Sequence, residues 1–218
     1  MNFNGCVFPD NLLYSPDADL WFTTSGNGFV TGISSVILWT CGKGIRIKTR
    51  NTTEIIEAGK SLASVESDRY FGTLRLPFSA RIVEINKSLG ASSISSSSIY
   101  GSDWIAVIEP VSIENAVGSL LPSGRAAGII EKKVSELRLT CFSDLPDADM
   151  IEIGSECNAV LSRVNQELEG KKPGFILHLV TDDQTSPIEM VRWSDETGNR
   201  IMERRKIENI FHFILRKQ

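Results

Sequence analysis

The sequence predicts two domains of different class, an all-β sandwich or barrel followed by a two-layer α+β domain. Residues 1–110 contain many short apolar segments at close spacing with glycine-containing turns between them, which is typical of an all-β sandwich or barrel. Residues 147–218 alternate short apolar segments with helix-forming stretches in the order β-α-β-α-β-β. Between them, residues 111–146 favour helix, so we expect either a helical linker or helices packed on a domain edge.

Composition and charge narrow the function classes. The chain has 218 residues and a net charge of -4, which argues against a nucleic-acid surface. No apolar run is long enough to span a membrane, and the amino terminus lacks the basic and apolar regions of a signal peptide, so we expect a cytoplasmic protein. Neither CxxC spacing nor enough histidine supports a zinc site, and free thiols are expected at all four cysteines, Cys6, Cys41, Cys141 and Cys157.

Strands of the first domain are expected where β-branched and aromatic residues are bounded by turn signals. Glycine pairs mark two of these turns, at residues 25–28 and 41–44, and Gly59-Lys60 marks a third. The expected strands are 20–22, 29–33, 36–40, 45–48, 54–58, 61–65, 71–76, 80–85 and 105–108.

A predicted hairpin near the middle of this domain is the first candidate site. Segments 61–65 and 71–76 flank a polar tip, residues 66–69, which predicts a tight turn that presents a side chain to solvent. Arg69 stands at the end of this tip. Lys60 precedes the hairpin and Lys87 follows the next expected strand, so neither lysine is expected at the tip.

Five motifs follow one another in order over residues 14–110: Tyr14 to Trp21, Gly28-Phe29-Val30-Thr31-Gly32-Ile33, Val65-Glu66-Ser67 with Pro77, Ala80-Arg81-Ile82-Val83-Glu84-Ile85-Asn86, and Tyr100-Gly101 with Trp104. Together they resemble the glycine cleavage H protein, and the resemblance implies the lipoyl/biotinyl barrel-sandwich fold. The resemblance implies a lipoyl-lysine at the hairpin tip, where this sequence has Arg69. A guanidinium stays protonated and is a poor acyl acceptor, so no lipoyl cofactor is expected.

The second domain is expected to pack two helices on one face of a four-stranded sheet. The expected strands are 150–153, 175–180, 201–205 and 210–215, and the expected helices are 158–169 and 186–197. After the first expected strand comes Cys157-Asn158-Ala159-Val160, at the start of the first expected helix. With this cysteine and its β-α-β-α-β-β order, the domain resembles the TusA/SirA-like sulfur carriers, which usually have Cys-Pro-x-Pro at this place; both prolines are absent here. Free N–H groups at a helix start stabilise a thiolate or persulfide, which makes Cys157 the candidate persulfide thiol.

Three functions remain open at this point. The preferred hypothesis is a sulfur-relay carrier, in which Cys157 carries a persulfide and the non-lipoylated H-like domain docks partners. The second is a non-catalytic scaffold or adaptor for proteins of lipoyl or sulfur metabolism. The third is a lipoyl carrier of glycine cleavage, which requires a different hairpin register from the one that places Arg69 at the tip. A carrier or adaptor is expected rather than a stand-alone enzyme, with sulfurtransferase activity left open and with no metal or membrane partner.

Overall fold

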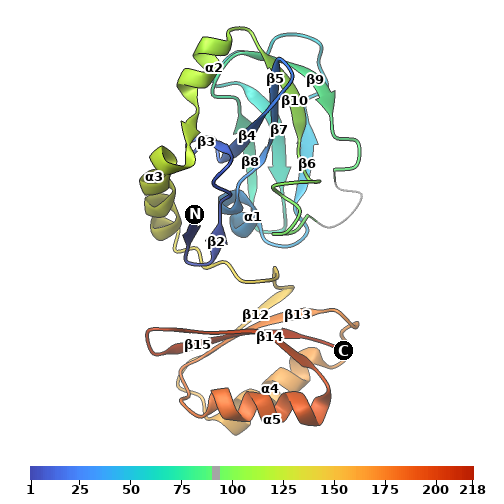
Figure 1. Ribbon diagram of the computed structural model, residues 1–218. Coiled ribbons are helices and arrows are strands. Elements are labelled where there is room, and N and C mark those ends of the chain that lie inside the picture. Colours follow the sequence, from blue (N-terminus) through green and yellow to red (C-terminus); the bar gives the residue numbers. More distant parts are fainter. Residues whose placement is uncertain (90–93) are drawn as a thin grey trace. The chain divides into compact units, whose positions relative to one another are not determined.

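The computed structural model describes residues 1–89 and 94–218, except that the side chain of Cys157 lies outside the description. The chain divides into two compact units, Met1–Cys141 and Phe142–Gln218 (Figure 1). Within the part of the chain that is described, no helix is both long and apolar enough to cross a membrane.

The first unit is built mainly from antiparallel sheets, as its short apolar segments predict. One sheet has the strand order β11-β3-β4-β5-β10-β9, and a second has the order β6-β7-β8. The strands of the larger sheet are β3 (Leu13–Ser15), β4 (Leu20–Ser25), β5 (Gly28–Ile33), β9 (Ala80–Ile85), β10 (Ala106–Pro110) and β11 (Leu121–Pro122). Those of the smaller sheet are β6 (Arg46–Thr49), β7 (Ser61–Glu66) and β8 (Phe71–Arg75). A separate short hairpin joins β1 (Asn2–Phe3) to β2 (Cys6–Val7).

Aromatic side chains fill the interior of this unit. The rings of Phe22, Phe29 and Phe78 pack with their centroids 5.7–6.2 Å apart. Trp21 is buried, and its indole nitrogen donates a hydrogen bond to the carbonyl of Ile99 at 2.8 Å. Gly32 lies across from this indole, where an added Cβ would be only 2.7 Å from the ring. The glycine therefore lets Trp21 lie flat on β5.

One predicted strand, 36–40, is wrong because these residues form helix α1 (Ser35–Cys41). A short apolar run fits a buried helix as well as a buried strand, so its periodicity could not decide between them. The chain turns out of α1 at Gly42, which has φ +72° and donates its N–H to the carbonyl of Leu38 at 2.8 Å. The predicted strand 54–58 is also not formed; Ile56 makes a single bridge to Ala80.

The helices predicted within 111–146 are α2 (Ile113–Ser119) and α3 (Ser123–Glu136). Ser112 caps α2 by accepting a hydrogen bond from the amide of Asn115 at 3.2 Å. One face of α3 enters the core of the first unit. The buried cluster that it joins consists of Cys6, Phe8, Leu12, Tyr14, Trp21, Val36, Ala126, Ile130, Val134 and Cys141.

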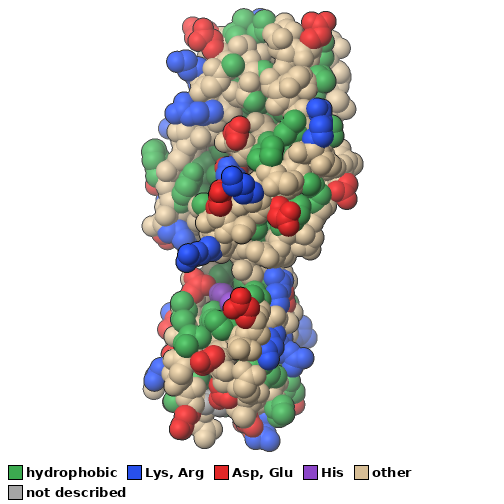
Figure 2. Space-filling view, turned by 90° about the vertical axis from the view of Figure 1, so that its left-hand side faces the viewer, with side chains coloured by type: hydrophobic (Ala, Val, Ile, Leu, Met, Phe, Trp, Pro, Cys, Tyr) green, Lys and Arg blue, Asp and Glu red, His purple; other side chains and the backbone are tan. Residues whose placement is uncertain are grey.

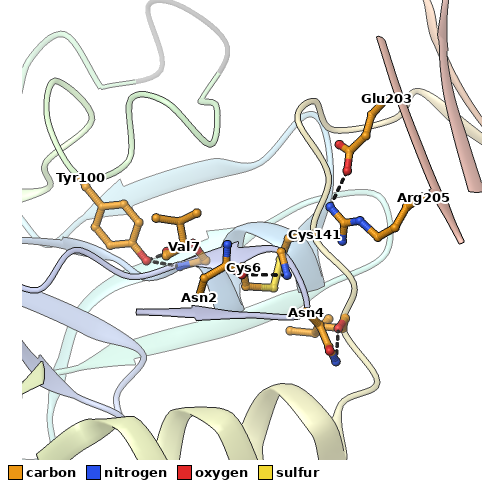
Figure 3. The surroundings of a disulfide bond; sticks show 11 residues. Asn2, Asn4, Cys6, Val7, Tyr100, Cys141, Glu203 and Arg205 are labelled. Carbon is orange, nitrogen blue, oxygen red and sulfur yellow. Dashed lines mark hydrogen bonds and ion pairs between the residues drawn. A yellow bond between two sulfur atoms is a disulfide. The ribbon is translucent and has the colours of Figure 1, made fainter. Parts of the chain in front are cut away.

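A disulfide joins Cys6 to Cys141, so the expectation of free thiols at these two positions was wrong (Figure 3). The two cysteines are 135 residues apart in sequence, yet their Cα atoms lie 4.8 Å apart. Beside the bridge, the amide of Cys141 donates to the carbonyl of Asn4 at 3.0 Å. Because this pairing depends on how the amino terminus packs against the segment after α3, cysteine spacing alone could not reveal it. Cys41 is a buried free thiol, as expected.

The second unit has the predicted β-α-β-α-β-β order. Its strands are β12 (Ala148–Glu152), β13 (Ile176–Thr181), β14 (Arg200–Ile207) and β15 (Ile210–Arg216). They form a sheet of order β12-β13-β15-β14, in which β12 and β13 are parallel and the other pairs antiparallel. Helices α4 (Cys157–Leu168) and α5 (Ser186–Thr197) cover one face of this sheet (Figure 1). Their core is Val160, Val164, Leu168, Leu177, Leu179, Met190, Trp193, Phe211, Phe213 and Leu215.

Candidate functional site

The β7–β8 hairpin lies where the sequence predicted it, and its tip is short. Cross-strand pairing runs from Ser61 with Arg75 up to Glu66 with Phe71. The amide of Ser67 then donates to the carbonyl of Tyr70 at 2.8 Å. This bond leaves only Asp68 and Arg69 as the loop. Arg69 is therefore one of two residues at the tip, and its side chain is exposed.

Ser67 attaches the tip to the end of helix α1. Its buried hydroxyl donates to the carbonyl of Cys41 at 2.9 Å, and it accepts the amide of Arg69 at 3.4 Å. The last carbonyls of a helix lack partners within the helix, so a side-chain donor there satisfies a group that would otherwise be unpaired. The serine of the Val-Glu-Ser motif thus fixes the position of the hairpin tip.

The guanidinium of Arg69 lies against Gly42, the residue that ends α1. A Cβ built on Gly42 would be 2.9–3.0 Å from three guanidinium atoms, so the absence of a side chain there makes room for the arginine. The carboxyl end of a helix carries partial negative charge, which favours a cation at this place. Arg69 consequently combines an exposed tip position with a packing role against α1.

No lysine replaces Arg69 at the tip. Lys60 lies at the far end of the hairpin, where its carbonyl accepts the amide of Leu76 at 3.0 Å. Lys87 comes after β9, outside the hairpin altogether. Both lysines are exposed, but neither is held on a two-residue turn.

Phe71 adds an exposed apolar group next to this tip. Its side chain is 77% exposed on β8, directly across from Glu66. Glu66 in turn pairs with Arg46 of β6 at 3.1 Å. Solvent-exposed aromatic side chains are common in surfaces that bind another protein. Sequence analysis placed Phe71 in a strand and did not single it out; alternation along β8 could have identified its outward face.

The second candidate, Cys157, is the first residue of α4, one residue before the expected start of this helix at 158. Because its side chain lies outside the described residues, only the backbone position can be compared with the prediction. The residues on either side of it, Glu156 and Asn158, line a hollow of about 620 Å³ together with Asp182 and Asp183 from the segment before α5 and Arg192 from within α5. Asp182 accepts a hydrogen bond there from the amide of Gly154 at 2.8 Å.

On the face drawn in Figure 2, acidic and basic side chains are interspersed over both units. Near the α4 start, Glu152 pairs with Arg163, and this hydrogen bond lowers the pKa of the Glu152 carboxyl. Burial raises the pKa of the Cys41 thiol to about 12, which keeps it protonated and unreactive at neutral pH. Among the residues described, no three His, Cys, Asp or Glu side chains are grouped to hold a metal ion.

Comparisons with known proteins agree with the resemblance of the first domain to the glycine cleavage H protein. The family model described as glycine cleavage H-protein matches residues 12–133. Glycine cleavage system H protein 5 of Aquifex aeolicus (strain VF5) is 30% identical over 143 residues, which are 63% of this chain and 97% of that protein. Probable glycine cleavage system H protein 2 of Sulfolobus acidocaldarius is 29% identical over 140 residues, covering 62% and 93%. A crystal structure of the H protein from Mycobacterium marinum matches 61% of this chain and 100% of that chain, at 22% identity and a TM-score of 0.46.

Proposed function

This chain belongs to the glycine cleavage H-protein family, and we propose that it acts as a non-lipoylated adaptor within that family of lipoyl carriers. In this role the first unit binds proteins that recognise H-protein hairpins but carries no lipoyl group of its own. The single observation that carries the proposal is Arg69 at the two-residue tip of the β7–β8 hairpin.

The chemistry of the tip supports an adaptor over a carrier. Attachment of lipoate forms an amide, which needs a lysine amine with a free electron pair, whereas a guanidinium remains charged and delocalised. The fixed tip and the exposed ring of Phe71 still offer a shaped surface to a partner. Because the tip residue is Arg69 and not a lysine, we do not propose a lipoyl-carrier role for this chain.

A competition assay tests the adaptor. A lipoate ligase transfers lipoate to an H protein that has the hairpin lysine, and the full-length chain is added in increasing amounts. The adaptor should slow the transfer, and excess H protein should restore it. Phe71→Asp should reduce the inhibition because it places a charge on the exposed contact surface. Ile207→Asp, on β14 of the second unit, is the matched control and should inhibit like the unchanged chain.

Two results would reject the adaptor. One is an unchanged transfer rate at a large excess of the chain. The other is incorporation of lipoate into the chain itself, which would make it a substrate rather than an adaptor.

A sulfur relay through Cys157 is the second candidate function, and one observation favours it. Cys157 is the first residue of α4 and follows the carboxyl end of β12, and the sulfur-carrier hypothesis requires a cysteine at such a helix start. In this function, Cys157 would accept sulfur as a persulfide and pass it to a protein partner of sulfur transfer.

Intact mass with peptide mapping after exposure to a persulfide donor tests the relay. One added sulfur on Cys157, lost in Cys157→Ala and kept in Cys41→Ala, would support it. Cys41 is the suitable control because it is a free thiol within the described residues, while Cys6 and Cys141 are bridged. An unchanged mass, or equal labelling of Cys41 and Cys157, would count against the relay.

A further inference from the structure

Two histidines and an aspartate form a hydrogen-bonded array on the sheet of the second unit. Nδ1 of His178, on β13, lies 2.9 Å from Oδ1 of Asp149 on β12. Nε2 of the same imidazole lies 3.0 Å from Nδ1 of His212 on β15. The core side chains of β13 and β15 that pack under α4 and α5 alternate with these histidines along each strand, so the array occupies the opposite face of the sheet.

The partners fix the tautomers of both histidines. An ionised carboxylate only accepts hydrogen bonds, so Nδ1 of His178 donates to Asp149. Nε2 of a neutral His178 is then an acceptor, and Nδ1 of His212 must donate to it. The array is therefore directional, with every bond satisfied when both imidazoles are neutral.

The segment that leads into the second unit lies on this array. The ring of Phe142 is 4.8 Å from that of His178 and 5.6 Å from that of His212, measured between centroids. The guanidinium of Arg205 lies over the same phenyl ring, 4.8 Å from its centroid. Phe142 is 7% exposed, so most of its surface is buried in this position.

Polar contacts hold the next residues of the segment. The amide of Ser143 donates to Oε2 of Glu203 at 2.7 Å, and Glu203 also pairs with Arg205. Asp144 pairs with Arg216 at 3.4 Å. The charged groups that face the histidines or hold the segment are thus Asp149 on β12, Glu203 and Arg205 on β14, Arg216 on β15, and Asp144 on the segment itself.

We propose that Asp149, His178 and His212 form a proton-binding latch that holds residues 142–145 on the sheet and releases them on acidification. A first proton leaves every bond in place, because His178 becomes a double donor and Nδ1 of His212 becomes the acceptor. A second proton leaves two imidazolium groups with N–H facing N–H. The bond between them is then lost and like charges meet beneath Phe142 and beside Arg205.

The surroundings keep the latch closed at neutral pH. Burial, together with the smaller effects of His178 and Arg205, lowers the pKa of His212 to about 4. Release of residues 142–145 uncovers His212, so its pKa rises from there toward the ordinary histidine value near 6.5, and the open form binds more protons than the closed form between these values. The closed latch therefore has its full stability above about pH 6.5 and loses it as the pH falls toward about 4. One proton changes the opening constant by at most about tenfold per pH unit.

Imidazole tautomers give the first test. Long-range proton–nitrogen NMR spectra of the full chain at neutral pH should show both histidines as Nδ1–H tautomers. A protonated Nε2 on His178 in the neutral array would overturn the proposed direction of the hydrogen bonds.

Hydrogen exchange gives the second test. After scaling for intrinsic exchange, the amide of Ser143 should lose protection by at least tenfold between neutral pH and about pH 4. His212→Asn keeps a donor near the Nδ1 position but cannot be protonated, so its protection should change much less. Phe142→Ala should expose Ser143 at every pH while α4 and α5 stay protected. Equal pH responses in the unchanged chain and His212→Asn would overturn the latch.

Discussion

At the scale of single residues, the hairpin tip is held by a side chain rather than by its turn geometry. Two-residue hairpin loops usually form type I′ or II′ turns, which require a positive φ. Neither Asp68 nor Arg69 has a positive φ, so the tip is a turn of neither type. The hydroxyl of Ser67 instead connects the tip to the carbonyl of Cys41. This contact positions Arg69 over Gly42 and thereby sets what the tip can present to a partner.

Ser67→Ala should lower the free energy of unfolding by about 1–2 kcal/mol, because it leaves a buried helix-end carbonyl without its donor. Urea denaturation measures the change. Ser64→Ala is the matched control on β7, the strand that leads to the tip; its side chain is half-buried, and the change should alter stability by less than about 0.5 kcal/mol. Equal effects of the two changes would contradict the role of Ser67.

At the scale of elements, close packing across strands explains why glycine occurs inside β5. Gly32 faces the indole of Trp21, and that indole also donates to the carbonyl of Ile99. A side chain at position 32 would move the ring and weaken a bond between segments far apart in sequence. Glycines in helices α2 and α3, Gly118 and Gly128, have open space around them instead.

Gly32→Ala should destabilise the first unit by about 1–3 kcal/mol, because its Cβ would lie 2.7 Å from the Trp21 ring. Thermal or urea unfolding followed by tryptophan fluorescence measures this effect. Gly118→Ala introduces the same methyl group in α2 with nothing within 4 Å, and helix propensity predicts a gain of up to about 1 kcal/mol. If Gly32→Ala were neutral, the packing of Trp21 on β5 would be refuted.

At the scale of the whole molecule, the disulfide closes most of the first unit into one covalent loop. Cys6 lies in the short β1–β2 hairpin and Cys141 is the last residue of the unit, and both are buried. A crosslink over so long a loop restricts the unfolded chain strongly.

Cys6→Ser with Cys141→Ser should lower the stability of the first unit by roughly 2–5 kcal/mol. Denaturation with and without reductant gives an independent measure, and the double variant should be insensitive to reductant. Thiol counting in denaturant should detect Cys41 and Cys157 alone before reduction. Four free thiols in the unreduced chain would disprove the bridge.

The sequence predicted most strands of both units because short amphipathic segments with glycine turns are local signals. Helix α5 matches its predicted bounds, since Pro187 and Gly198 mark its start and end. Residues 36–40 were assigned wrongly because 36–39 are four consecutive apolar residues, and so short an apolar run shows neither the helical nor the strand period. The Cys6–Cys141 bridge and the His178–His212 pair depend on tertiary packing, so local patterns could not reveal them.

In the hairpin, too, local sequence patterns predicted some features of the candidate site, while others depend on tertiary contacts. Its strands, its tip and the position of Arg69 followed from residue types and spacing. The contact of Ser67 with Cys41 and the packing of Arg69 on Gly42 could not be predicted, because they join residues that the chain separates by the two strands β6 and β7 and the loop between them.

The most direct test of the central claim is the intact mass of the full chain after incubation with lipoate ligase, lipoate and ATP. Arg69 at the tip predicts an unchanged mass, while Arg69→Lys should gain one lipoyl group, mapped to position 69. Lys60 and Lys87 remain present in both proteins and serve as internal controls. A lipoyl group on any lysine of the unchanged chain would contradict the account and identify the protein as a lipoyl carrier.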